Sequence, residues 1–140
     1  MAGKTYTHQL DAKNRMRIPA KLREDLGENY TITVGTGGCL YVYTSEQWKR
    51  VEEALSKVNP CMQEQLKAAR FIQYSAFTPE EDKHGRFILE KKLINWAKIV
   101  KNIIICNGPS CVEIWGEEAY NDYFNEVDFS SIASLMSNVK

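Results

Sequence analysis

A short alternating segment followed by a helix-like segment is the first clear pattern along the chain. Residues 15–18 alternate polar and apolar, the period of a half-buried strand. Pro19 suits the first position of a helix, and Leu22 and Leu26 lie four residues apart on one face of that helix. Gly27 follows as a typical helix stop. The pattern predicts a strand and then a short helix.

A β-hairpin is predicted next. Residues 30–34 alternate again, residues 39–43 form an apolar run rich in β-formers, and the turn-type residues 35–38 lie between them. A glycine-rich loop can also hold a phosphate, but such a loop precedes a helix. The position between two strands therefore favours a hairpin turn.

Two helices are expected after the hairpin. Thr44 and Gln47 have the spacing of a capping box, which opens the first of them. Its apolar residues share one face: Trp48, Val51, Leu55 and Val58. Asn59-Pro60 ends it, and a second helical stretch covers residues 61–74.

The C-terminal part predicts one more helix and a tail. The aromatic and apolar residues that form one stripe of this helix are Tyr120, Tyr123, Phe124 and Val127. Residues from Ser130 onward are mostly small and polar, so we expect them to be loosely held.

The same phrase occurs twice, 71 residues apart, at residues 10–15 and 81–86. Each copy has an aspartate, an arginine four residues on, and a lysine between the two. Leu22 aligns with Leu93 at the same offset, and Trp48 aligns with Tyr120 after a one-residue slip. This indicates a duplicated unit. A copy of roughly 45 residues rarely buries enough surface to fold alone, so the two copies should share one core.

Charge is unevenly distributed in a chain that is neutral overall, with 18 basic and 18 acidic residues. Residues 1–23 have a net charge of +5 and residues 113–140 a net charge of −5. Such a chain can present a basic face to phosphates, although ordinary solvated surface charge is an equally simple reading. Because there is no apolar run of 18 residues and no secretory N-terminus, we expect a cytoplasmic protein without membrane contact.

The cysteines do not predict a metal site. Cys39, Cys61, Cys106 and Cys111 form no Cys-x-x-Cys pair, and both histidines, His8 and His84, lie far from them in sequence. Small buried thiols in a reducing compartment are the expected state. No cofactor is predicted.

Four segments together resemble the MraZ family: LDAKNRMRIPAKLRE at residues 10–24, GCLYVY at 38–43, EDKHGRFIL at 81–89 and VEIW at 112–115. The family has two SpoVT/AbrB-like halves in one chain. The resemblance implies an α+β fold, a tandem-duplicated swapped-hairpin β-barrel with flanking helices. It also implies a ring-shaped, octamer-like homo-oligomer. Its partner would be double-stranded DNA, bound at direct repeats in the promoter of a bacterial cell-division and cell-wall gene cluster, which places the protein at the nucleoid.

On this reading the chain has four parts. Residues 5–47 form the first SpoVT/AbrB-like repeat, 48–75 a helical connector, 76–119 the second repeat, and 120–140 the C-terminal helix and tail.

The repeated phrases supply the candidate site. An Asp carboxylate can accept from backbone N–H groups or from the arginine four residues later, which holds the guanidinium at a fixed angle for phosphate or guanine. The loop-structuring residues are Asp11, Asn14, Asp82 and Gly85, of which Asn14 and Gly85 share a position that tolerates positive φ. The candidate DNA-binding residues are Lys13, Arg15, Arg17, Lys83 and Arg86. The simpler alternative is that the Asp–Arg pairs only tie hairpins.

The second copy departs from the first at three positions. Ile88 stands where the first copy has Arg17, which suggests burial against another part of the chain or a neighbouring protomer. Glu90 replaces the helix-starting proline, and Ile94 stands where the first copy has Arg23. The first copy is therefore the stronger candidate for reading DNA.

Three other functions compete with DNA binding. An enzyme would need a nucleophile or an acid–base pair, and the nearest candidate is Asp82 with His84. A ring-forming structural or interaction protein that does not bind DNA is a second alternative. An AbrB-type antitoxin usually carries one copy and a toxin-binding tail, whereas this chain has two copies.

Overall fold

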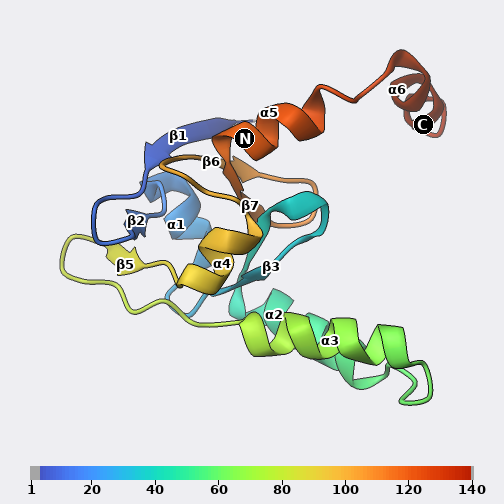
Figure 1. Cartoon of the computed structure of the whole chain (residues 1–140), viewed down its shortest axis with the longest axis horizontal. Coiled ribbons are helices and arrows are strands. Elements are labelled where there is room, and N and C mark those ends of the chain that lie inside the picture. The colour runs from blue at the N-terminus through green and yellow to red at the C-terminus, as the bar shows by residue number, and fades with distance from the viewer. Residues whose placement is uncertain (1–3, 140) are drawn as a thin grey trace.

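The computed structural model describes residues 4–139 and has an α+β architecture (Figure 1). Lys140, the last residue of the predicted C-terminal part, lies outside the described residues. The strands are β1 (Thr5–Gln9), β2 (Arg15–Arg17), β3 (Thr31–Val34), β4 (Leu40–Tyr43), β5 (Arg86–Ile88), β6 (Asn102–Asn107) and β7 (Val112–Gly116). The helices are α1 (Ala20–Leu26), α2 (Ser45–Ser56), α3 (Gln63–Ser75), α4 (Lys91–Trp96), α5 (Glu117–Phe124) and α6 (Phe129–Met136).

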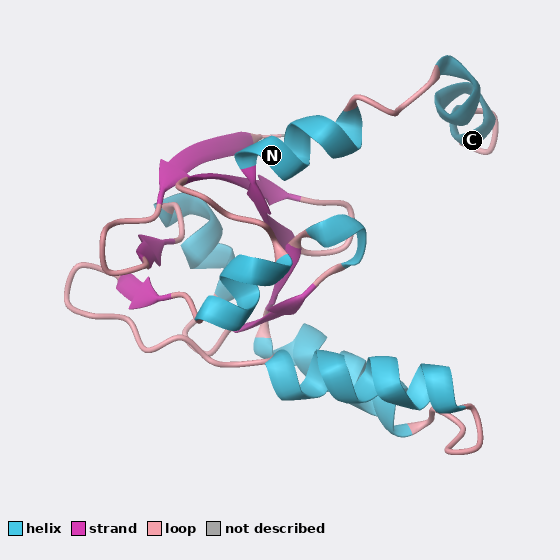
Figure 2. Ribbon diagram, in the orientation of Figure 1, coloured by secondary structure: helices cyan, strands magenta, loops and turns pink. Residues whose placement is uncertain are grey.

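Both sheets contain strands from the two repeats (Figure 2). Within the five-stranded sheet, β3 pairs with β4 inside the first repeat and β6 pairs with β7 inside the second. In the five-stranded sheet, β1 of the first repeat pairs antiparallel with β6 of the second, and β4 of the first pairs with β7 of the second. The two-stranded sheet joins β2 of the first repeat to β5 of the second. Each repeat therefore completes its sheets with strands of the other.

One hydrophobic core serves both repeats, as the sequence predicted. Met16, Leu22 and Ile32 of the first repeat and Phe87 and Ile105 of the second belong to the same buried cluster. Burying this surface jointly removes more apolar area from water than a unit of about 45 residues can bury alone. The interleaving is therefore a condition of stability for both repeats.

The expected barrel is not closed within residues 4–139. The five-stranded sheet has the order β1-β6-β7-β4-β3, so β1 and β3 are its edges. An isolated antiparallel bridge between Ile32 and Phe77 continues pairing beyond β3. The fold is thus established as α+β with antiparallel sheets.

The hairpin and the connector helices match their predictions. Residues 36–38 form a short 3₁₀ turn between β3 and β4. The Thr44 side chain accepts from the Gln47 N–H at 3.1 Å, and the Gln47 side chain accepts from the Thr44 N–H at 3.0 Å, which is the predicted capping box. α2 and α3 then run as a helical pair that projects from the sheet (Figure 1). The predicted division after residue 47 falls inside α2, and the four-part division stays a prediction.

The predicted C-terminal helix is shorter than expected, and the exposed tail contains a further helix. The predicted helical stripe ends at Phe124, and Val127 lies in the link to α6. Residues from Phe129 form helix α6, which begins where the Asp128 side chain accepts from the Ser131 N–H at 2.8 Å. Tyr123 and Phe124 pack on Trp115 with ring centroids 5.1 and 5.5 Å away, so α5 is anchored to β7.

The cysteines are free thiols in more than one environment. Cys39 and Cys111 are buried as predicted, and burial raises the pKa of each thiol to about 12. Cys106 is half-buried, and Cys61 is exposed, so the prediction of buried thiols was wrong for Cys61. Among residues 4–139 no group of His, Cys, Asp and Glu has the arrangement of a metal site. Over the same residues, every helix is too short or too polar to span a bilayer.

Candidate nucleic-acid interface

The loop between β1 and β2 is closed by Asp11. One carboxylate oxygen, Oδ1, accepts from the backbone N–H of Lys13 at 2.9 Å and of Arg15 at 2.8 Å. The other, Oδ2, accepts from Arg15 Nε at 2.7 Å. The Asp11 N–H in turn donates to the Arg15 carbonyl at 3.1 Å. Asp11 engages the guanidinium of Arg15 through Nε. The edge that carries the two Nη atoms remains available to a ligand.

The loop before β5 repeats this arrangement atom for atom. Asp82 Oδ1 accepts from the N–H of His84 at 2.8 Å and of Arg86 at 2.9 Å, and Oδ2 accepts from Arg86 Nε at 3.0 Å. Asn14 and Gly85 both adopt positive φ, 59° and 77°, as predicted from their shared position. The two Asp-x-x-x-Arg phrases are therefore two copies of one loop structure. The proposed enzymatic pair, Asp82 and His84, is a backbone contact within this loop.

The β2–β5 pairing places the two loops side by side. Arg15 lies opposite Ile88, Met16 opposite Phe87, and Arg17 opposite Arg86. Met16 and Phe87 point into the core, with 3% and 2% of their surface exposed. Because side chains alternate across a strand, Arg15, Arg17, Arg86 and Ile88 share the outward face of this ribbon. We call these four residues the arginine face.

Ile88 is a member of this face, although its apolar character predicted a buried contact. It is 62% exposed, so none of residues 4–139 buries it. A neighbouring protomer that covered Ile88 would also cover Arg15 directly across the ribbon. Ile88 lies beside Arg15 because of the pairing register of β2 and β5, which the sequence alone does not reveal.

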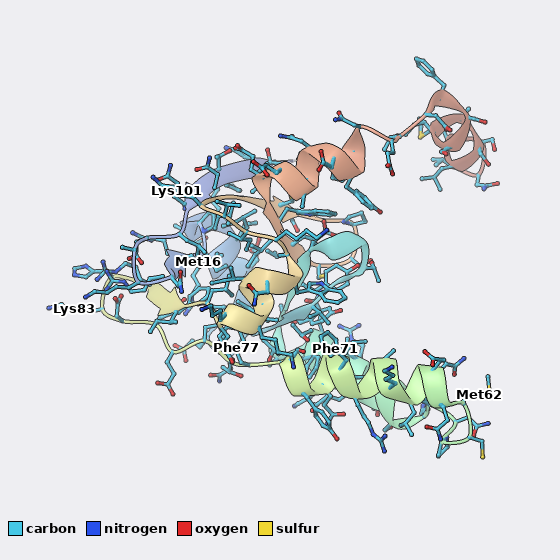
Figure 3. All side chains as sticks on the ribbon, in the orientation of Figure 1. Met16, Met62, Phe71, Phe77, Lys83 and Lys101 are labelled. Carbon is cyan, nitrogen blue, oxygen red and sulfur yellow. The ribbon has the colours of Figure 1, made fainter. Side chains whose placement is uncertain are left out.

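The lysines are exposed near the loop tips but are not equivalent. Lys13 occupies the position of His84, and Lys83 occupies the position of Ala12. Lys83 extends from the loop at the end of the molecule opposite to Met62 (Figure 3). The two loops and their strands carry five basic residues and two aspartates, a net charge of +3.

Arg23, part of the N-terminal basic segment, is already engaged. Its Nε donates to Glu81 Oε2 at 2.8 Å, and its guanidinium lies 5.2 Å from the centre of the Tyr30 ring. Tyr30 also donates to Glu81 through its hydroxyl. Partial burial acts to raise the pKa of Glu81, but the hydrogen bonds from Arg23 and Tyr30 outweigh it and hold that pKa below its ordinary value. This network joins the repeats, so the charge count of residues 1–23 overstates the free basic charge.

The two loops and the C-terminal helix α6 lie at opposite ends of the molecule. Figure 1 shows the β2 and β5 loops at one end and α6 at the other, with α5 between them. The segment from Glu117 to Asp128 holds five acids and no base. These acids lie on α5 and the link to α6 and not on the two loops, so the loops themselves keep their positive net charge.

The loop carboxylates are held in their charged form. Hydrogen bonds from the backbone of Arg86 and His84 and from the Arg86 side chain lower the pKa of Asp82 to about 2, and those from Arg15 and Lys13 likewise lower the pKa of Asp11. A depressed folded-state pKa means that the stabilisation is complete above the ordinary value of 3.8 and is lost as pH falls through about 2. The loops should therefore stay closed at neutral and mildly acidic pH.

We expect an NMR titration to report this directly. The ¹³C carboxyl shift of Asp82 should have its midpoint near pH 2, and the amide shift of His84 should move over the same interval. Asp82→Asn should abolish both transitions. A midpoint at or above 3.8 would contradict the closed loop.

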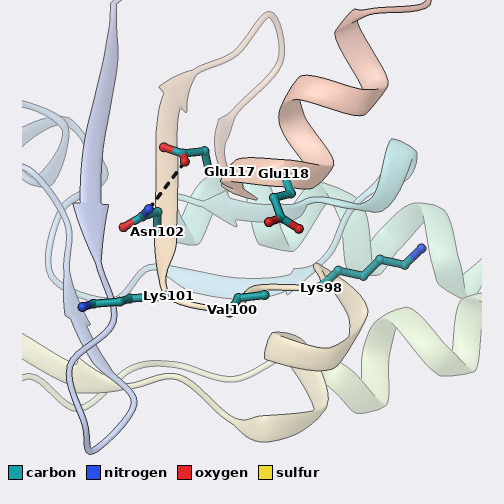
Figure 4. A pocket seen from close by; sticks show the side chains of 6 residues that line it. All are labelled: Lys98, Val100, Lys101, Asn102, Glu117 and Glu118. Atoms are coloured by element: carbon teal, nitrogen blue, oxygen red, sulfur yellow. Dashed lines mark hydrogen bonds between the residues drawn. The ribbon is translucent and has the colours of Figure 1, made fainter.

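The hollows of the surface lie elsewhere. A shallow pocket of about 110 Å³ lies between the start of β6 and α5, and Glu117 in it accepts from Asn102 at 3.4 Å (Figure 4). Its lining mixes lysines and glutamates, which largely compensate each other. In Figure 1 the loops of the candidate interface protrude from the body of the molecule, a shape suited to entering a groove of a partner.

Comparison with known proteins adds independent findings. The chain matches the family described as "MraZ protein, putative antitoxin-like" over residues 1–71 and again over residues 72–138. It is 42% identical to the transcriptional regulator MraZ of Clostridium acetobutylicum, over 96% of this chain and 95% of that protein. It is 41% identical to the protein of the same name from Thermoanaerobacter sp. strain X514, over 89% and 87% of the two chains.

Proposed function

The chain belongs to the MraZ family, and we propose that it is a transcriptional regulator that binds promoter DNA through its paired Asp-x-x-x-Arg loops. The target would be direct repeats upstream of a bacterial cell-division and cell-wall gene cluster. The interleaved repeats are, on this proposal, the two halves of a swapped-hairpin barrel. Catalysis, a cofactor and a metal have no part in it, and the site of action is the nucleoid in the cytoplasm.

One observation supports DNA binding most strongly: Arg17 and Arg86 face each other across a two-stranded sheet. Like charges directly opposite each other in a sheet are destabilising. Arg86 is partly compensated by Asp82, whereas Arg17 makes no ion pair with any residue from 4 to 139. A phosphate bound between the two guanidinium groups would remove the repulsion. The arrangement is therefore expected in a protein whose partner is a polyanion.

The shape of the site supports duplex DNA in particular. An antiparallel two-stranded ribbon fits the major groove of B-DNA, which is about 12 Å wide. Asp11 and Asp82 hold the side chains of Arg15 and Arg86 in place. These arginines therefore lose less conformational entropy when they bind a phosphate or a guanine edge. Both points favour sequence-dependent contacts in addition to attraction to the backbone.

We also propose that the protein assembles into a ring through α6. This helix has no buried residue, and its apolar side chains are mostly exposed, Phe129 at 95% and Leu135 at 67%. It is joined to α5 by a thin link and projects away from the body of the molecule (Figure 1). An apolar helix held in this way is suited to contact another copy.

The complementary surface on the second copy would be α3. Phe71 and Tyr74 are exposed there. Three cations, Lys67, Arg70 and Lys92, and one acid, Glu64, lie around them, and Lys92 Nζ is 4.8 Å from the centre of the Phe71 ring. The acids that precede α6 match this basic rim. Because α6 and α3 are different surfaces, repetition of the contact is head-to-tail, which yields a closed ring when the rotation closes.

The proposal is tested by titrating DNA from upstream of the protein's own gene. We expect tighter binding to this fragment than to a shuffled one of equal composition. Affinity should fall with salt, with a slope of about −0.9 per phosphate neutralised. If the protein binds both fragments equally weakly, the proposed promoter binding is wrong. The alternative, a ring-forming interaction protein that does not bind DNA, would then be favoured.

Lys13→Ala should act through phosphate contact alone. Lys13 is exposed at a loop tip, and only its backbone N–H, not its side chain, bonds to Asp11. Removing the side chain should therefore weaken binding to the promoter and shuffled fragments by the same factor. The slope of log Kd against log salt should become shallower by about one unit. Lys49→Ala, which removes an exposed lysine of α2, is the control and should leave the slope unchanged. A Lys13 variant that alters the preference for promoter over shuffled DNA would assign this lysine to base reading instead.

A further inference from the structure

Ile88 stands out within the arginine face because it is apolar, exposed and rigidly placed. It lies at the end of β5, opposite Arg15 and two residues from Arg86. Its side chain is 62% exposed, whereas the neighbouring Phe87 and Leu89 are 2% and 0% exposed. A β-branched side chain on a strand has few rotamers, so this apolar surface has a defined direction.

We propose that Ile88 contacts the C5-methyl group of a thymine in the major groove. The inference rests on the proposed function and specifies which base the ribbon reads. Thymine is the base that presents an apolar group in the major groove, and aliphatic side chains recognise it there. Arginines on the same face can contact guanine edges or phosphates. The ribbon therefore carries the chemistry for a site in which a thymine lies close to the bases or phosphates contacted by Arg15 and Arg86.

The position of Ile88 disfavours a protein partner. A second copy packed on Ile88 would also cover Arg15, which lies directly across the ribbon and whose only ion-pair partner among residues 4–139 is Asp11 in the same loop. Covering this cluster without further compensation would desolvate charge at a cost. DNA offers both the methyl group that suits Ile88 and the phosphates that suit the arginines.

The test removes a single methyl group from the DNA. Each thymine of the promoter repeat is replaced in turn by deoxyuridine, and Kd is measured for wild type, Ile88→Ala and the control Met62→Ala. Met62 is also an exposed apolar residue, 49% exposed, at the opposite end of the molecule (Figure 3). For wild type and Met62→Ala we expect one thymine of the repeat at which removal of the methyl weakens binding about fourfold, as for one apolar carbon removed from water.

Ile88→Ala should bind thymine DNA as weakly as wild type binds the deoxyuridine DNA, and should show no further weakening at that position. Its salt dependence and its mass by light scattering should match wild type. If wild type binds tightly and no thymine is sensitive, or if Ile88→Ala keeps full methyl sensitivity, the thymine contact is wrong while the proposed function stands. If Ile88→Ala changes the oligomeric state, Ile88 belongs to an interface between copies. If wild type does not prefer the promoter fragment, the proposed function itself fails.

Discussion

Arg15→Ala should weaken promoter binding more than any other single loop substitution, by about 1–3 kcal/mol for each base or phosphate that Arg15 binds, roughly five- to 150-fold in Kd. Arg15 lies in the loop that also carries Lys13 and Arg17, whereas the second loop supplies only Lys83 and Arg86 as cations. Its side chain is fixed by the 2.7 Å bond to Asp11, so it is ready to bind before DNA arrives. Arg86→Ala should also weaken promoter binding, but by a smaller factor in Kd. Fluorescence anisotropy at matched salt provides the measurement.

Stability should change little in the same variant. The Arg15–Asp11 pair is partly exposed, with 26% and 36% of the two side chains accessible, and solvent screening leaves ion pairs of this kind little net contribution to stability. Arg50→Ala removes an equal charge from the exposed surface of α2 and should leave Kd almost unchanged. If Arg15→Ala binds the promoter as tightly as wild type, the loops are hairpin ties and not a reading surface.

Much of the fold follows from local patterns because those patterns report burial on one face. The alternation at residues 15–18 and 30–34 reappears as β2 and β3, and the capping box at Thr44 begins α2. β1 escaped prediction because its sequence, Thr-Tyr-Thr-His-Gln, has one apolar residue and its pairing partner β6 is almost 100 residues away. α6 could have been predicted. Asp128 caps it, and Phe129, Ile132 and Met136 recur at helical spacing, although the small polar residues between them obscured the pattern.

The individual loops of the site were predictable, but their combination was not. Each Asp-x-x-x-Arg phrase closes on itself within five residues, so its hydrogen bonds depend on local sequence. The pairing of Arg17 with Arg86 depends on how the repeats interleave, which is a tertiary property. The same holds for Arg23, whose partner Glu81 is 58 residues away. Charge counts along the sequence therefore placed Arg23 with the free cations although it joins the two repeats.

Assembly should contribute as much to affinity as any single side chain of the loops. Single DNA-reading modules bury roughly 600–1,000 Å² of protein surface, and one β2–β5 ribbon offers less than a large dimeric interface. A ring presents several identical ribbons, so a promoter with several repeats holds the second ribbon at high effective concentration. Such linkage raises apparent affinity by about 10²–10⁴ although each ribbon binds as it would alone. Wild type should therefore bind three repeats far more tightly than one.

Leu135→Asp should abolish this gain. Leu135 is 67% exposed on α6, so a charge there leaves the core intact but opposes the proposed packing against α3 of another copy. We expect the variant to elute as a smaller species, to bind a single repeat as wild type does, and to lose the 10²–10⁴ advantage on three repeats. Ser134→Asp places the same charge one residue away on the polar side of α6 and should assemble normally. If the Leu135→Asp protein remains assembled, α6 is not part of the interface between copies. If wild type binds one repeat as tightly as three, assembly does not contribute to DNA affinity.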